Sequence, residues 1–497
     1  MENTKQIELG TKPVGRLLFK LSIPAILAQI INVLYNVVDR MYIGHIEDIG
    51  AIALTGVGVT MPIIMAVSAF AYLISMGGAP RSSIMMGKKS YDKAEEILGN
   101  SAMALIIIAV TITIFLLIFA KPLLLFFGAS ENTIIYALRY LRIYSIGTIF
   151  VQLALGLNAF ITAQGKAKTS MFTVLIGAIC NIILDPIFIF GFNMNVRGAA
   201  LATIISQAVS CLWILYFMTS KKTILKLRIK YLKISPNVIL PCLALGFSPF
   251  IMQFTESILF VCFNTSLFKY GGDLAVGAMT ILSSIMQFSF LPIYGLTQGS
   301  QPIISYNYGA NNIDRVKATF KILLISSVMF STLMWVISMF FPYLFVRIFT
   351  SDETLINYSI WALRIYMASS LILGAQSACQ QTFVALGNAK ISAFLAILRK
   401  VILLIPLIFI LPIFIENKVM AVLLAEPIAD IIAVLTTVTM FYIFFKKLIK
   451  SKIFYIKVVC IDRTVFGKVY APVLSTGNKA EIDQIRNHKR NARFFYV

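Results

Sequence analysis

The stretch Leu-Arg-Ile-Tyr at residues 141–144 occurs again, unchanged, at residues 363–366, a shift of 222 positions. The same shift aligns Ser-Met-Gly-Gly-Ala-Pro at 75–80 with Thr-Gln-Gly-Ser-Gln-Pro at 297–302, without a gap. Further identical pairs in this register are Ser83 with Ser305, Gly87 with Gly309, Asp92 with Asp314, Gly165 with Gly387, Lys168 with Lys390, and Ser170 with Ser392. Chance could produce one such match, but several in one register indicate an internal repeat.

The composition places both copies of the repeat in a membrane. Hydrophobic residues make up 59% of the 497 residues and charged residues 13%, whereas a soluble domain is about half apolar and a quarter charged. The apolar residues form long runs, such as 102–120, 201–218 and 401–415, and roughly 20 helical residues cross a hydrocarbon core. One run could be a buried core helix of a soluble protein, but too few polar residues remain to cover a dozen.

The fold class predicted is an all-α polytopic membrane protein with twelve transmembrane helices in two pseudo-symmetric six-helix bundles. We expect helices near 17–42, 53–78, 96–119, 131–156, 170–191, 199–219, 239–263, 276–300, 318–345, 353–378, 391–413 and 419–445. Because each repeat holds an even number of helices, both copies enter the membrane in the same direction, as in parallel repeats related by an axis along the membrane normal. The two bundles should face each other across a central cavity and rock against one another.

The predicted division is an N-lobe at 1–219, a cytoplasmic linker at 220–238, a C-lobe at 239–445 and a cytoplasmic tail at 446–497. The Gly–Pro motifs at 77–80 and 299–302 are candidate turns for the rocking motion, or alternatively simple helix ends. The tail is expected to have no role in transport; the alternative is an amphipathic cytoplasmic extension.

The net charge of +22 does not indicate nucleic-acid binding, because the basic residues are sorted by loop. Odd-numbered connections carry most of them, including Lys88, Lys89 and the linker from Lys221 to Lys233, and alternate connections carry about one each. This asymmetry predicts a multi-pass protein of the plasma membrane with both termini in the cytoplasm. The six cysteines form no close pair, which excludes a cysteine metal box or a disulfide framework.

Two acids in the predicted N-lobe are candidates for ion binding, because an ionisable group at mid-membrane costs about 2.5–3.5 kcal/mol on insertion scales. Asn32, Tyr35, Asn36 and Asp39 share one face of the first helix, and Asp185 lies one turn after Asn181. Asn32, Tyr35 and Asn36 are predicted to line the central cavity for substrate, together with Gln253 and Glu256 of the seventh helix. Carboxylate and amide oxygens suit a hard cation such as Na⁺, or the two acids could share a proton. The alternative is that each acid only pairs with a neighbouring arginine for packing.

The predicted C-lobe helices carry further charged residues. Glu256, near Gln253 in the seventh helix, is interpreted as a lone carboxylate that attracts a cationic ligand or carries a proton. Its alternative is a hydrogen bond to neighbouring Thr or Ser side chains. Arg399 with Asp430 or Glu426 is predicted to form a structural ion pair between helices eleven and twelve.

Several motifs together resemble the MATE (multidrug and toxic compound extrusion) family, over about residues 10–450. They are Pro24 with Asn-Val-Val-Asp-Arg at 36–40, Asn-Ile-Ile-Leu-Asp-Pro at 181–186, Gly-Ala-Ala-Leu-Ala-Thr at 198–203, Gln-Gly-Ser-Gln-Pro-Ile-Ile-Ser-Tyr-Asn-Tyr-Gly-Ala at 298–310, and Glu-Pro-Ile-Ala-Asp at 426–430. The resemblance implies a Na⁺ or proton site on Asp39, Asn181, Asp185 and Thr203, with Asn158 close by, and a coupling or substrate role for Glu256.

Two departures from the family pattern refine this expectation. Residues 369–378 contain no acid, although another branch of the family has one in helix ten. In the repeat, Leu403 and Leu407 align with Asn181 and Asp185, so the second copy also lacks these polar side chains. Ion coupling is therefore expected in the N-lobe alone. In addition, about fifty residues follow position 450, where similar family members end.

The function expected is a secondary active exporter that moves small cationic amphipathic compounds out of the cell against inward Na⁺ or H⁺. A flippase of lipid-linked sugars shares the architecture, but would be expected to have a strongly cationic cavity. An intramembrane enzyme is the other alternative; however, the two histidines, His45 and His488, lie outside the predicted mid-membrane region, and no nucleophile–base pair, metal motif or nucleotide loop is present. We expect no cofactor besides the coupling ion, and a monomer.

Overall fold

The structure is a computed structural model that describes the backbone of residues 8–474 and the side chains as far as residue 449. The chain divides into a compact unit of residues 1–438 and a second unit of residues 439–497. The first unit holds both helical bundles. The described part of the second unit is the continuation of one long helix, α16 (Lys418–Leu474). The predicted tail at 446–497 is thus helical to Leu474, and its residues 475–497 lie outside the described residues.

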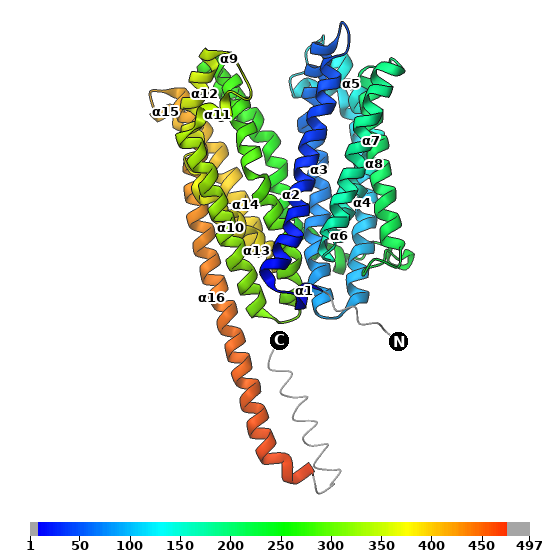
Figure 1. Cartoon of the computed structure of the whole chain (residues 1–497), viewed down its shortest axis with the longest axis vertical. Helices are drawn as coiled ribbons and strands as arrows, with labels where there is room; N and C mark the ends of the chain where they lie inside the picture. The colour runs from blue at the N-terminus through cyan, green and yellow to red at the C-terminus, as the bar shows by residue number, and fades with distance from the viewer. Residues whose placement is uncertain (1–7, 475–497) are drawn as a thin grey trace. The chain divides into compact units, whose positions relative to one another are not determined.

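The first bundle, called the N-lobe, consists of helices α2 to α8 (Figure 1). It follows a short helix α1 (Glu8–Thr11). Its members are α2 (Val14–Gly44), α3 (Gly50–Gly87), α4 (Tyr91–Phe126), α5 (Ile134–Ile146), α6 (Thr148–Ala163), α7 (Ala167–Pro186) with the π-helical turn η1 (Ile187–Gly191), and α8 (Val196–Thr219). A break of 59° separates α5 from α6, so that the two form one bent span.

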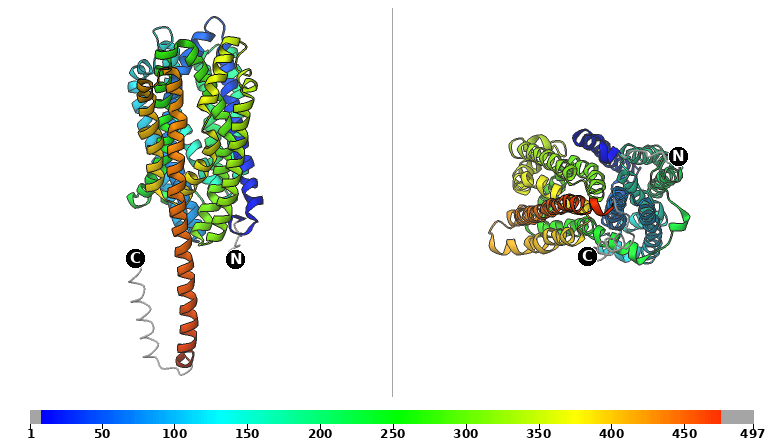
Figure 2. Two further views of the ribbon diagram at one scale, coloured as in Figure 1. Left: turned by 90° about the vertical axis from the view of Figure 1, so that its left-hand side faces the viewer. Right: turned by 90° about the horizontal axis from the view of Figure 1, so that it is seen from below.

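The second bundle, called the C-lobe, begins after the short helix η2 (Ile229–Tyr231). Its members are α9 (Pro236–Gly309), α10 (Ile313–Phe340), α11 (Pro342–Val346), α12 (Glu353–Tyr366), α13 (Ser370–Ala385), α14 (Ala389–Ile397) with η3 (Leu398–Leu404) and α15 (Ile405–Phe414), and the first part of α16. Gly272, with φ 63° and ψ −158°, divides α9 into two helices. Figure 2, seen from below, shows the helices of the two lobes as neighbouring groups.

The predicted twelve spans are confirmed. Among the described residues, nine helical stretches are long and apolar enough to cross a membrane, and the bent pair α5 and α6 makes a tenth. The division of α9 at Gly272 supplies the eleventh. The pair α12 and α13 forms the twelfth span, because it is equivalent in the repeat to the pair α5 and α6. The helices are longer than the sequence indicated, because their ends carry polar residues that a hydropathy pattern excludes.

The sequence repeat is also a repeat of backbone detail. Ser83 donates a hydrogen bond to the carbonyl of Ala163 at 2.8 Å, and Ser305 donates the equivalent bond to the carbonyl of Ala385 at 2.7 Å. Gly165 and Gly387 adopt φ values of 77° and 78° in equivalent turns, a conformation that glycine adopts at little cost. The two lobes therefore share one scaffold in spite of their different charged residues.

The interpretation of the Gly–Pro motifs as turns or helix ends is wrong. Residues 77–80 lie inside α3, and residues 299–302 lie inside α9. Their glycines are sites of close approach between the lobes instead. A Cβ atom on Gly77 would lie 1.9 Å from the carbonyl oxygen of Cys242, and one on Gly299 would lie 2.3 Å from Oγ of Ser22. Glycine is required there because any side chain would separate the helices.

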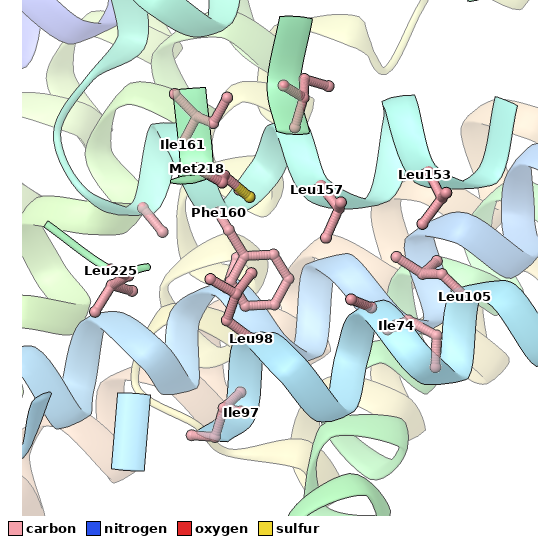
Figure 3. Packing of buried hydrophobic residues seen from close by; sticks show 14 of the residues in the cluster. Ile74, Ile97, Leu98, Leu105, Leu153, Leu157, Phe160, Ile161, Met218 and Leu225 are labelled. Carbon is pink, nitrogen blue, oxygen red and sulfur yellow. The ribbon is translucent and has the colours of Figure 1, made fainter. Parts of the chain in front are cut away.

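The face of the bundles at which α2 begins, formed by residues 88–90, 164–166, 220–235, 310–312 and 386–388, is called the basal face. The lobes are in tight contact beside this face, where Gly87 of α3 and Gly309 of α9 each pack against backbone of the other lobe. The N-lobe core near the same face is built around Phe160, which is fully buried among Leu98, Leu157 and Met218 (Figure 3). The contacts at Gly87 and Gly309 therefore hold the two lobes together at the basal end.

Candidate cation-binding site

The two N-lobe acids selected from the sequence come together in the structure. Asp39 lies on α2 and Asp185 lies near the end of α7, and these two helices pack against each other. Both side chains are buried, and their carboxyl groups interact directly. Two buried carboxylates side by side repel each other unless a proton or a metal cation lies between them. The pair is therefore suited to holding a cation.

The surrounding amides leave oxygen atoms without partners. Asn181 donates from Nδ2 to Oδ1 of Asp185 at 3.2 Å, and Asn158 donates from Nδ2 to the carbonyl of Ser170 at 3.3 Å. Among the described residues, no hydrogen-bond partner reaches Oδ1 of Asn181, Oδ1 of Asn158, Oδ1 of Asp39 or Oδ2 of Asp185, although all four are buried. Unpartnered buried oxygens are costly, and a hard cation requires oxygen ligands. This donor set fits Na⁺ or a proton.

A cavity of about 60 Å³ lies in the N-lobe next to this pair. Its lining includes Asn32, Tyr35, Asn158, Asn181 and Thr203. Asp39 and Asp185 do not line it themselves, and Asn181 connects the cavity to the acids through its hydrogen bond to Asp185. The volume is large enough for a small ion with water molecules, since about 10–15 Å³ of such space holds one water. It is far smaller than the roughly 300–1,000 Å³ of small-molecule sites.

The other residues proposed for the N-lobe site lie nearby but hold their side chains locally. Thr203 donates from Oγ1 to the carbonyl of Ala199, one turn earlier on α8. Asn36 donates from Nδ2 to the carbonyl of Asn32 on α2. The alternative that Asp39 or Asp185 pairs with an arginine finds no support, since neither forms an ion pair within the described part of the chain.

The interpretation of Glu256 as a lone carboxylate is wrong. Lys400 donates from Nζ to Oε1 of Glu256 at 2.8 Å. The alternative of a hydrogen bond to Thr255 or Ser257 is also wrong, because these hydroxyls donate to the carbonyls of Ile251 and Pro62. Gln253, one turn earlier, is half-buried on the same helix. Helical periodicity relates charges within one helix, so it does not predict that Glu256 pairs with Lys400, which lies in the eleventh span.

The predicted ion pair of Arg399 is confirmed, and it includes both acids. Arg399 contacts Oδ1 of Asp430 at 2.7 Å through Nε and Oε1 of Glu426 at 3.3 Å through Nη2. Ser369, at the junction of α12 and α13, donates to Oδ2 of Asp430 at 2.9 Å. All three charged side chains are largely buried. Such a network joins spans ten, eleven and twelve, which is the structural role expected of it.

The comparisons with known proteins agree with this architecture. The MatE family profile matches residues 24–187 and 249–410. The multidrug export protein MepA of Staphylococcus aureus (strain N315) is 28% identical over 430 residues, which cover 85% of this chain and 93% of that protein. MepA of Staphylococcus haemolyticus (strain JCSC1435) is 29% identical over 391 residues, covering 78% and 85%.

Solved structures share the fold at lower sequence identity. One, described as the outward-facing conformation of a multidrug resistance MATE family transporter of the MOP superfamily, has a TM-score of 0.83 at 22% identity. A MOP superfamily transporter from Pyrococcus furiosus, described as having a binding pocket of reverse polarity, also gives 0.83 at 22% identity. Each match covers 90% of this chain and 99% of the other chain. At this level of identity, the likeness shows the fold.

Proposed function

The chain belongs to the MATE family of multidrug and toxic compound extrusion transporters, and from this membership we propose that it exports small cationic amphipathic compounds in exchange for inward Na⁺ or H⁺. It is a multidrug efflux transporter of the plasma membrane rather than an enzyme. The basal face carries the basic loops, so we place it, with both termini, in the cytoplasm. We further propose a monomer with the lobe boundaries predicted above.

The juxtaposition of Asp39 and Asp185 supports the coupling part of the proposal. When Na⁺ is the coupling ion, Asp39, Asn181, Asp185 and Thr203 would hold it, with Asn158 close by; when the ion is H⁺, the two acids would share it. In either case the bound cation removes the repulsion between α2 and α7 and draws the two helices together. Pro24 interrupts the hydrogen bonding of α2, so that this helix can bend while the rest of the N-lobe keeps its packing.

The space between the lobes supports the substrate part of the proposal. The side chain of Glu256 is 45% exposed although it lies in the middle of the seventh span. A partly exposed carboxylate at that depth favours a position facing the space between the lobes, because contact with lipid would be costly. Tyr294 lies near Glu256 on the C-lobe side and near Tyr72 of the N-lobe. Aromatic rings beside a carboxylate attract flat organic cations through cation–π and charge contacts.

Exchange of ion for substrate requires that each weakens the binding of the other. This effect on binding affinity is equal in both directions by thermodynamic necessity. We propose that the lobes open on the side opposite the closely packed basal face, which is the side on which an exporter releases substrate and accepts an external cation. A flippase of lipid-linked sugars is not proposed, since the curated relatives are multidrug export proteins.

Efflux of the lipophilic cation tetraphenylphosphonium from proteoliposomes tests the proposal. A Na⁺ gradient and a pH gradient are imposed separately, and one of them should drive export by the wild type. Asp39→Asn and Asp185→Asn should abolish gradient-driven export while the protein still inserts and unfolds cooperatively. Glu131→Gln, at an exposed carboxyl in the turn before α5, is the matched control. Full export by either aspartate variant would show that the N-lobe acids do not couple transport.

A further inference from the structure

The segment of residues 220–235, called the strap, connects α8 to α9 and is fixed to the N-lobe by buried polar side chains. Oε1 of Gln164 accepts hydrogen bonds from the backbone of Ile224 and Leu225 at 2.8 and 3.0 Å and from Oγ1 of Thr223 at 2.9 Å. Leu225 is fully buried and inserts into the core cluster around Phe160 (Figure 3). These contacts therefore fix the conformation of the first half of the strap.

The second half of the strap follows the side of α4. Glu95, which is buried, pairs with Arg228 at 2.6 Å and accepts a bond from the backbone of Lys226 at 3.2 Å. Oδ1 of Asn100 accepts a bond from the backbone of Ser235 at 2.7 Å. Between these contacts, Gly99 leaves room for the strap, since a Cβ there would lie 2.6 Å from Tyr231. All of these partners belong to the first ten residues of α4.

These contacts set the depth of the strap in the membrane. Helix α4 begins at Tyr91, and the nine residues from there to Asn100 span about 13.5 Å at 1.5 Å per residue. The strap thus runs beside the first turns of a transmembrane helix rather than beyond its end. Figure 1 shows this segment at the outer edge of the N-lobe, above the lowest turns of α3 and α4. With the basal face in the cytoplasm, as proposed above, this position would bring the strap to the headgroup layer of the inner leaflet.

The exposed surface of the strap is basic and interrupted by apolar side chains. Five exposed lysines form no ion pair within the described part of the chain; they are Lys221, Lys222, Lys226, Lys230 and Lys233. Ile229 is 87% exposed, and Ile234 is exposed as well. Among the acids at the start of α4, Glu95 is used by Arg228, Asp92 accepts from the hydroxyl of Tyr231, and Glu96 is half-buried. Lysines interleaved with exposed apolar side chains form the kind of surface that binds at a lipid interface.

We propose that the strap is a binding surface for the headgroups of anionic phospholipids in the cytoplasmic leaflet, with Ile229 inserted between the acyl chains. This assignment rests on the proposed cytoplasmic orientation of the basal face. The lysines would contact the phosphates, and the fixed backbone would present them together without further ordering. A nucleic acid or soluble anion would use the lysines but would leave Ile229 in water, so the lipid is the partner that satisfies both features.

Quenching of Trp213 by brominated lipids tests the proposal. Trp213 lies on α8, is 36% exposed and precedes the strap by less than two turns of helix. The full-length protein with Trp335→Phe and Trp361→Phe retains this tryptophan alone, since the chain has three. In vesicles that mix phosphatidylcholine with brominated phosphatidylglycerol, quenching should exceed that by brominated phosphatidylcholine at the same mole fraction. The difference should shrink as the salt concentration rises, because headgroup attraction is screened.

Neutralising the strap should remove this preference. Lys226→Gln, Lys230→Gln and Lys233→Gln together should lower the relative affinity for phosphatidylglycerol on the order of 100-fold, at roughly fivefold for each lysine. The matched control, Lys317→Gln, Lys321→Gln and Lys390→Gln, removes the same charge from the basal side of the C-lobe and should keep the preference. Ile229→Asn, with every charge retained, should weaken quenching by both lipids.

Two outcomes would overturn the inference. One is an unchanged preference for phosphatidylglycerol in the strap variant. The other is loss of the wild-type preference when inorganic phosphate is added at constant ionic strength, which would identify a soluble anion as the ligand. Quenching requires no transport, so this test and the export assay fail independently of each other.

Discussion

Lys400 Nζ lies 2.8 Å from Oε1 of Glu256, which joins the eleventh span to the seventh in the middle of the membrane. The lysine is almost fully buried, while the glutamate is 45% exposed. The ammonium group of Lys400 therefore occupies, on this carboxylate, the place that the charged group of a cationic substrate would take. A substrate that binds Glu256 must compete with a cation that belongs to the protein.

Replacing this internal competitor should strengthen substrate binding. Lys400→Met keeps most of the apolar stem and frees Glu256, so we expect tetraphenylphosphonium to bind about tenfold more tightly, a gain of about 1.4 kcal/mol. Equilibrium binding to the purified protein measures this change. Lys390→Met, at an exposed lysine of the basal face, should have no effect. An unchanged Kd in Lys400→Met would show that Glu256 does not contact the substrate.

The unpartnered oxygen of Asn158 should contribute to cation binding. Asn158→Leu removes Oδ1 at similar volume, and we expect the concentration of coupling ion needed for half-maximal export to rise about tenfold, consistent with loss of one ligand of about 1–2 kcal/mol. Asn264→Leu is the control, since Oδ1 of Asn264 is also buried without a partner but lies in the C-lobe. Equal effects of the two variants would indicate a loss of packing instead.

The close contact of the lobes at the basal face predicts a strong effect of one methyl group. In Gly87→Ala the new Cβ would lie 2.0 Å from the carbonyl oxygen of Tyr306, which is backbone and cannot move aside alone. The lobes should then fail to close at this face, and the initial rate of export should fall at least tenfold. Gly58→Ala in the same helix meets no atom within 4 Å and should retain the wild-type rate. Normal export by Gly87→Ala would contradict the closure described here.

Arg399 should be essential to stability rather than to transport. Arg399→Gln leaves Glu426 and Asp430 buried without their cation, and loss of one partner of a buried ion pair costs about 3–5 kcal/mol. The midpoint of thermal unfolding in detergent should fall clearly below that of the wild type. Arg142→Gln, at an exposed arginine of α5, should leave the midpoint unchanged. If the additional change Asp430→Asn restores none of the loss in Arg399→Gln, the two residues are not coupled.

Much of the fold follows from local patterns in the sequence. The number of spans depends on the length of apolar runs, and their arrangement in two lobes depends on the repeat of 222 residues. Asn181 and Asp185 were placed on one helix face, and their hydrogen bond at 3.2 Å confirms that placement. The motifs at 77–80 and 299–302 predict turns wrongly, because glycine and proline in soluble proteins often end helices, whereas in these spans the glycines permit close packing.

The sequence by itself determined the helices, the repeat and which polar residues share a face, because helical periodicity relates only residues within a few turns. Tertiary structure alone decided which charges meet. It paired Lys400 with Glu256 across 144 positions, gave Arg399 two acids, brought Asp39 against Asp185, and fixed the strap to Glu95 and Asn100. Such contacts depend on how whole helices pack and rotate against one another, a property that no single stretch of sequence contains.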